Sequence, residues 1–241
     1  LFIASFTMSG LNIVATVFSV RAPGMSMMRM PLTVWSYFIS AIMGLLAFPP
    51  LTAAAIMLLF DRHLGTSFFL PSGMIVSGKV LANEGGSPLL WQHLFWFLGH
   101  PEVYVLILPA LGIALDILPV FSRKPVFGYR VSVYSLIAVG FLSMVVWGHH
   151  MFVSGMSPFS GEYFTLSTML ITIPMTVIGV NMLGSLWGGR ITLKTPMLFA
   201  LGIIALFGVG GFGGLFLGNA TADMQLHDTY FVVGHFHLMI G

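Results

Sequence analysis

The sequence has very little charge and no cysteine. Only 7% of its 241 residues are Asp, Glu, Lys or Arg, whereas a soluble domain carries about a quarter. This scarcity of charge excludes an ordinary soluble globular domain. The absence of cysteine excludes disulfide bonds and thiolate metal ligands, so any metal site must be built from other side chains.

Long apolar runs fill most of the chain, and its mean hydropathy is +0.99. A helix of about 20 residues crosses the roughly 30 Å hydrocarbon layer of a bilayer. Seven runs of this kind occur, at about 1–20, 32–60, 88–121, 128–153, 163–188, 195–218 and from 228 to the end. The alternation typical of membrane barrel strands is absent. We therefore predict an all-α, polytopic transmembrane helix bundle, forming a single membrane-embedded domain over 1–241. Because residue 1 already lies in an apolar run without a preceding basic segment, we expect a piece of a longer protein, not a signal peptide.

The charges that remain are distributed asymmetrically among the six connections. All charged residues of the first, third and fifth connections are basic. They are Arg21, Arg29, Arg123, Lys124, Arg130, Arg190 and Lys194. The acidic residues of the other three are Asp61, Glu84, Glu162, Asp223 and Asp228, with only Arg62 and Lys79 beside them. The positive-inside rule then places the odd connections in the cytoplasm or matrix. The basic pI of about 9.1 reflects this topology, so we expect no nucleic acid partner.

Six of the eight histidines lie inside or at the edge of the apolar runs: His100, His149, His150, His227, His235 and His237. An imidazole at membrane depth is costly and normally indicates a ligand, a proton relay or a metal site. At 1.5 Å per helical residue, the clusters on three separate runs all fall in the outer third or half of the bilayer. We expect them to meet there, which scattered histidines satisfied by neighbouring helices would not do.

Angles along the helices separate the histidines by role. His235 and His237 point about 200° apart and must face two different sites. The adjacent His149 and His150 lie near a helix end, where the backbone can adjust, so both could reach one ion. His100 and Tyr104 share a helix face. Imidazole ligands without thiolates suit copper or zinc, and a lone axial imidazole suits haem iron.

Three segments carry these histidines: WQHLFWFLGHPEVY at 91–104, WGHHMF at 147–152 and HDTYFVVGHFH at 227–237. With RAPGMSMMRMPLTVWS at 21–36 and KPVFGY at 124–129, they closely resemble the catalytic subunit I of the haem-copper oxidases, the cytochrome c and quinol oxidases. The resemblance covers nearly the whole chain, which would be about half of a subunit I, with seven of about twelve helices.

The resemblance implies a set of metal and haem ligands. The copper would be bound by His100, His149 and His150. The high-spin haem would be bound by His235, and the low-spin haem by His237 together with a second histidine outside the chain. A magnesium ion at the interface with subunit II would be held by His227 and Asp228.

The resemblance also implies an activity. A terminal respiratory oxidase reduces dioxygen to water and couples this to proton translocation, with cytochrome c or quinol as donor and subunits II and III as partners. Tyr104 would be covalently joined to His100, Glu102 would be the gate where protons divide between chemistry and pumping, and Asp223 would lie near a haem propionate. We expect an energy-transducing membrane, the bacterial inner membrane ahead of the mitochondrial one.

Two alternatives belong to other functional classes. Nitric oxide reductases share the histidine arrangement but use non-haem iron with nearby glutamates and lack a tyrosine at the position of Tyr104. A proton or ion transporter without a redox cofactor would explain intramembrane Glu and His, but not their common depth. A catalytically reduced paralogue is a third reading, suggested by the departures described next.

The chain departs from the family along a second proton channel. The family's lysine, threonine and serine positions are occupied by Ile178, Met175 and Leu115. Four threonines form one face of the fifth run and offer a substitute path: Thr165, Thr168, Thr172 and Thr176. Membrane threonines usually bond to carbonyls of their own helix, and we favour that interpretation. Asp116 replaces a family histidine, and we expect it to be solvated at a helix end, not to take up protons.

Overall fold

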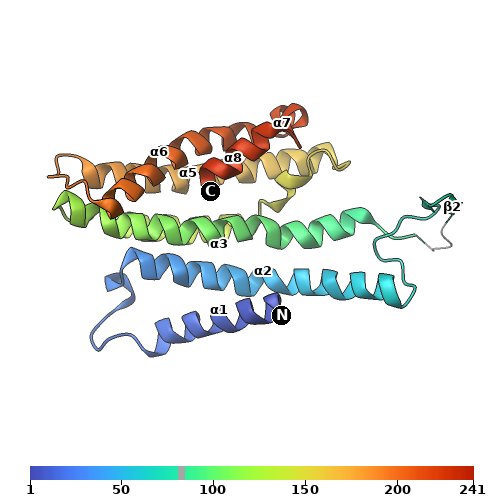
Figure 1. Ribbon diagram of the computed structural model, residues 1–241, viewed down its shortest axis with the longest axis horizontal. Helices are drawn as coiled ribbons and strands as arrows, with labels where there is room; N and C mark the ends of the chain where they lie inside the picture. Colours follow the sequence, from blue (N-terminus) through green and yellow to red (C-terminus); the bar gives the residue numbers. More distant parts are fainter. Residues whose placement is uncertain (81–84) are drawn as a thin grey trace.

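The computed structural model describes residues 1–80 and 85–241 and consists of long helices lying side by side (Figure 1). Glu84, one of the acidic residues counted above, lies outside the described residues. The elements in chain order are α1 (Phe2–Ser19), η1 (Met27–Arg29), α2 (Leu32–His63), β1 (Ile75–Val76), β2 (Lys79–Val80), α3 (Pro88–Ser122), α4 (Tyr129–Ser143), η2 (Trp147–Met151), α5 (Pro158–Leu186), α6 (Thr195–Leu217), α7 (Ala220–Leu226) and α8 (Tyr230–Ile240).

Five of the helices, α1, α2, α3, α5 and α6, are long and apolar enough to cross a membrane. The apolar helices α4 and α8 are shorter, with 15 and 11 residues. The predicted helix bundle is confirmed, but the run 128–153 is not one continuous helix. The backbone N–H of Val145 bonds to the carbonyl of Leu142, and that of His149 to Val146. Bonds across three residues tighten the chain into the 3₁₀ turn η2, so the α-helical geometry of α4 does not continue to 153.

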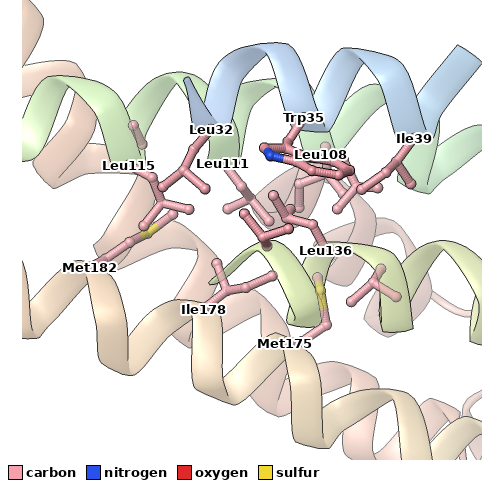
Figure 2. Packing of buried hydrophobic residues seen from close by; sticks show 14 of the residues in the cluster. Leu32, Trp35, Ile39, Leu108, Leu111, Leu115, Leu136, Met175, Ile178 and Met182 are labelled. Carbon is pink, nitrogen blue, oxygen red and sulfur yellow. The ribbon is translucent and has the colours of Figure 1, made fainter. Parts of the chain in front are cut away.

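The core lies where α2, α3, α4 and α5 meet (Figure 2). Leu108, Leu111 and Leu115 of α3 are completely buried, against Leu136 of α4 and Ile178 of α5. Helices in a membrane associate mainly through close packing, because lipid tails are as apolar as leucine. This packing brings the helices into one rigid frame for the histidines.

α2 and α3 approach each other closely at Gly112. A methyl group at Gly112 would overlap Ser36 Oγ and would lie 2.9 Å from the carbonyl oxygen of Leu32. Only glycine permits this approach, so an alanine at Gly112 would push the two helices apart.

The carboxylate of Asp116 caps the beginning of α2, so the expectation that it is solvated at a helix end is wrong. Its Oδ2 accepts hydrogen bonds from the Thr33 N–H at 2.9 Å and the Thr33 hydroxyl at 2.7 Å, and Oδ1 accepts from Leu32 N–H at 3.2 Å. The first N–H groups of a helix have no helical partner, and Pro31 at the cap position offers no side-chain acceptor. A carboxylate from the neighbouring helix replaces the missing cap.

Hydrogen bonds hold the two ends of the loop between α2 and α3 together, close to the helices. Asp61 accepts hydrogen bonds from the Thr66 hydroxyl at 2.7 Å, Phe68 N–H at 2.8 Å and Phe69 N–H at 3.0 Å. The N–H of Ser87 bonds to the carbonyl of Phe68 across the loop. Beyond these bonds, β1 and β2 form a short antiparallel hairpin that projects past the ends of α2 and α3 (Figure 1).

Candidate metal centre

The structure brings together three of the predicted ligands, one from α3 and two from η2. A set of ring nitrogens from His100, His149 and His150 lies within 4.8 Å of one another, and this is the one group of three or more potential metal ligands in the described part of the chain. His100 Nδ1 lies 3.2 Å from His150 Nε2. The 3₁₀ geometry of η2 allows two adjacent histidines to point at one position, as predicted from their place near a helix end.

Two contacts fix the orientation of the histidine rings. The ring of Trp96 stacks on that of His150, with centroids 3.9 Å apart and planes within 7°. The hydroxyl of Thr168 donates to the carbonyl of Phe164 at 2.5 Å and lies 2.9 Å from His149 Nδ1. That hydroxyl can therefore accept a hydrogen bond from Nδ1–H, which leaves the Nε2 lone pair of His149 free for a metal.

Sequence reasoning missed the contacts of Trp96 and Thr168 with the cluster. Trp96 lies on α3 and Thr168 on α5, and each meets a residue of η2, so no local spacing indicates the contact. From the sequence, Thr168 was predicted only as a member of the threonine face of the fifth run.

The buried ring of His100 has one nitrogen without a partner. His100 is 4% exposed, and its Nε2 makes no hydrogen bond within the described residues. The ring of Tyr104, one turn further along α3, lies edge-on with its centroid 4.7 Å away. The predicted sharing of a helix face by His100 and Tyr104 is confirmed.

Glu102 lies on another face of α3. It lines a small cavity of about 10 Å³ together with Phe6 of α1 and Gly44, Ala47 and Phe48 of α2, which is room for about one water molecule. The structure therefore places Glu102 toward α1 and α2, away from the ring of His100.

His235 and His237 have different surroundings, as their spacing predicts. His235 Nδ1 donates to the carbonyl of Gly210 on α6 at 2.8 Å, so its Nε2 is available to a ligand. A methyl group at Gly214 would lie 3.0 Å from Cε1 of His235, and glycine there gives the ring its space. His237 instead lines an open cavity of about 430 Å³ beside Leu106 of α3, and its Nδ1 lies 2.9 Å from the carbonyl of Val233.

The remaining predicted site residues gather around α7. Asp223 is buried, with 3% exposure, and accepts a hydrogen bond from His227 Nδ1 at 2.7 Å. Burial raises the pKa of Asp223, although the hydrogen bond and the charge of His227 oppose this shift. Asp228 Oδ1 lies 3.9 Å from His227 Nε2, and the Asp228 side chain is 94% exposed. The ring of His227 therefore lies between a buried carboxylate, to which it is hydrogen-bonded, and an exposed carboxylate.

His93, seven residues before His100 on α3, is hydrogen-bonded to η2. Its Nδ1 accepts a hydrogen bond from Trp147 Nε1 at 3.2 Å, and it lies outside the group of potential ligands found among the described residues.

Comparison with known proteins identifies relatives of this chain. An "Alternative cytochrome c oxidase subunit 1" of Bradyrhizobium diazoefficiens is 54% identical over all 241 residues. Proteins named "Cytochrome c oxidase subunit 1" from Cereibacter sphaeroides and Bacillus subtilis are 46% and 45% identical over 238 and 232 residues, which are 99% and 96% of this chain. The chain spans only 41%, 40% and 36% of the length of these three relatives. The model of one family, described as "Cytochrome C and Quinol oxidase polypeptide I", matches residues 1–241, and the chain belongs to this family.

Proposed function

We propose that the chain is part of the catalytic subunit of a terminal respiratory oxidase, an oxidoreductase that reduces dioxygen to water and couples the reaction to proton translocation. The observation that carries this proposal is the convergence of three imidazoles from α3 and η2 on one position within an apolar helix bundle. The names of the relatives, which are longer proteins, support the same activity.

The residues at the cluster fit copper. Its donors are three neutral nitrogen ligands, His100, His149 and His150, with no carboxylate among the described members of the group, and imidazole suits copper. The Nε2 of His100 makes no hydrogen bond within the described residues, and the ring of Tyr104 lies beside it, which fits a covalent bond between these two side chains. The lack of a glutamate in the described group argues against the nitric oxide reductase alternative.

The chain's own residues would orient ligands and supply protons. With the copper and high-spin haem iron bound, the metals supply the site at which dioxygen is held and reduced. Thr168, whose hydroxyl lies 2.9 Å from His149 Nδ1, would hold His149 in the tautomer that offers Nε2. Tyr104 would place a phenol proton beside the reacting position, and the Glu102 carboxyl lies on another face of α3 next to a cavity for about one water molecule.

The two haems would be bound through α8. His235, held by the carbonyl of Gly210, is proposed as the axial ligand of the high-spin haem, and His237 as one axial ligand of the low-spin haem. Asp223 would lie near a haem propionate. We also propose that His227 and Asp228 hold a magnesium ion, with Asp223 orienting His227 from behind.

The proposed setting is a multisubunit complex in an energy-transducing membrane, bacterial or mitochondrial. The chain would form part of a single membrane-embedded domain, with subunits II and III as partners and cytochrome c or quinol as the electron donor. Its five long apolar helices show a multi-pass membrane protein.

The test is an optical spectrum and metal analysis of the full-length subunit purified with its partner subunits. We expect one low-spin and one high-spin haem signal, copper in equal amount to the high-spin haem, and oxygen consumption with a reduced donor. A complex without haem would support the transporter alternative. Non-haem iron in place of copper would support the nitric oxide reductase alternative, and bound cofactors without turnover would indicate the reduced paralogue.

A matched pair of threonine variants tests the orientation of His149. Thr168→Val removes the hydroxyl that contacts His149, and we expect copper content or oxygen reduction to fall by about 10- to 100-fold, the usual effect of losing such a partner. Thr172→Val makes the same change one turn away, where the hydroxyl donates to the carbonyl of Met169 in its own helix at 2.6 Å. We expect wild-type copper and turnover in Thr172→Val. Wild-type behaviour of Thr168→Val would contradict the orienting role. An equal loss of turnover in both variants would also contradict it and would support the threonine path for protons.

A further inference from the structure

We propose that the loops α3–α4 and α5–α6 together bind the phosphate headgroup of an anionic phospholipid, through the guanidinium groups of Arg123 and Arg190. These two residues and Lys194 are called the loop patch. The inference needs only a chain that crosses the membrane, so it stands apart from the proposed oxidase reaction.

Main-chain hydrogen bonds join the end of α3 to the loop α5–α6. The N–H of Arg190 donates to the carbonyl of Ser122 at 2.9 Å, and the N–H of Thr192 donates to the carbonyl of Phe121 at 2.8 Å. Figure 1 shows the end of α3 and the turn between α5 and α6 at the same end of the molecule. Because Arg123 directly follows Ser122, the backbones of Arg123 and Arg190 lie side by side.

Two further contacts hold the loops together. The ammonium group of Lys124 donates to the carbonyls of Gly184, at 3.1 Å, and Trp187 at the end of α5. A methyl group at Gly189 would lie 2.9 Å from both Cβ and the carbonyl oxygen of Ser122, so glycine permits the close approach of the loop. The patch is therefore built on a fixed backbone, and Lys124 serves to fix it.

The backbone of Arg123 has a conformation that favours glycine. Arg123 ends α3 in the left-handed region, with φ 54° and ψ 44°, where a side chain adds steric cost and glycine does not. The exposed guanidinium of Arg123 makes no hydrogen bond or ion pair within the described residues. No contact inside this part of the chain offsets the cost, and an arginine kept in such a conformation indicates a partner outside it.

The positive charge of the loop patch is not neutralised by neighbouring side chains. Arg123, Arg190 and Lys194 are all exposed. Both ion pairs among the described residues belong to His227, and the carboxylate of Asp116 is occupied at the start of α2. A guanidinium presents a planar fork of N–H donors that binds a phosphate through two parallel hydrogen bonds. Two such groups on adjoining backbones suit a phosphate.

The position of the patch favours a lipid over a soluble phosphate. The helices α3, α5 and α6, which end or begin here, are long enough to cross a membrane, so the loops lie at the level of the headgroups. Trp187 is 84% exposed, and exposed Trp side chains are typical of membrane–water interfaces. Ile191 and Leu193 are also exposed and would contact acyl chains, whereas a free phosphate gains nothing from them. The positive-inside rule places the loops on the side where anionic lipids are enriched.

The test is photolabelling of the full-length subunit, purified with its partner subunits and reconstituted in phosphatidylcholine vesicles. A trace of photoactivatable phosphatidylglycerol or photoactivatable phosphatidylcholine is added, and mass spectrometry measures the label on residues 187–194. We expect phosphatidylglycerol to label this segment more strongly than phosphatidylcholine. Arg190→Gln should lower the phosphatidylglycerol label about fivefold, the usual effect of one basic residue near an anionic surface. The main-chain bond of residue 190 to Ser122 remains in this variant.

Arg123→Gly separates lipid binding from a structural role. It removes the guanidinium and supplies the residue that the backbone favours, so the label should fall about fivefold while the melting temperature does not fall. A lower melting temperature with an unchanged label would make Arg123 structural and would overturn the proposal. Arg29→Gln is the matched control, because Arg29 is an exposed residue of η1 in another basic connection. An equal loss of label in Arg29→Gln would mean general attraction to the surface and no site.

Two outcomes in the wild-type complex overturn the lipid directly. Equal labelling by the two lipids would show that the patch does not recognise the charged headgroup. Loss of the phosphatidylglycerol label on addition of millimolar inorganic phosphate, at constant ionic strength, would show a site for soluble phosphate. Haem content and oxygen consumption of the same preparation test the proposed function separately, so either proposal can fail alone.

Discussion

Replacing His149 with alanine should abolish oxygen reduction while both haem signals remain. His149 is one of three proposed copper ligands, and the two remaining imidazoles leave the ion weakly bound. The proposed haem ligands lie on another helix, α8, so haem binding should survive. The measurements are copper content, the optical spectrum and turnover of the purified complex, with an expected loss of activity of at least 100-fold.

The control for this prediction is His93→Ala. His93 also lies near η2, but it bonds to Trp147 and stands outside the ligand group of the described residues. It should retain copper and most of the activity. Wild-type turnover in His149→Ala would remove the copper assignment, whatever the result for His93.

Alanine at His235 and alanine at His237 should produce different spectral losses. His235 is held against α6 by the carbonyl of Gly210, and we expect its replacement to remove the high-spin signal. His237 lines a cavity beside α3, and its replacement should remove the low-spin signal. Difference spectra of the reduced complexes, with and without carbon monoxide, separate the two haems.

Each variant is the control for the other, since both remove an imidazole from the same helix. Loss of the same band in both would contradict the assignment of two separate sites. Loss of all haem in His235→Ala alone would indicate that α8 needs its ligand to fold, and His235→Gln would then distinguish folding from ligation.

The sequence predicted the parts of the site that depend on spacing along one helix. His100 and Tyr104 share a face of α3, and His235 and His237 point to different surroundings, because helix geometry fixes both relations. The long spans could also be predicted, because the length of an apolar run indicates whether a helix can cross the bilayer. The extent of α4 could not be predicted, because the 3₁₀ turn of η2 depends on backbone hydrogen bonds and not on hydrophobicity.

Contacts between helices were the part that the sequence could not supply. Trp96 stacks on His150, and Asp116 caps α2, across gaps of 54 and more than 80 residues. An acidic residue near a helix end is usually solvated, and nothing in the sequence indicated that a second helix begins beside it. Packing at Gly112 brings α2 close enough for this contact.

The hairpin between α2 and α3 gives a convenient position for labelling. Asp61 and the backbone bond from Ser87 to Phe68 close the loop before the hairpin begins, so residues inserted at its turn should not disturb the helices. Ser77 and Gly78 form this turn with positive φ angles of 51° and 78°. Because the chain has no cysteine, a Ser77→Cys variant would carry this chain's single thiol. Its reaction with a membrane-impermeant maleimide would establish which side of the membrane the hairpin occupies.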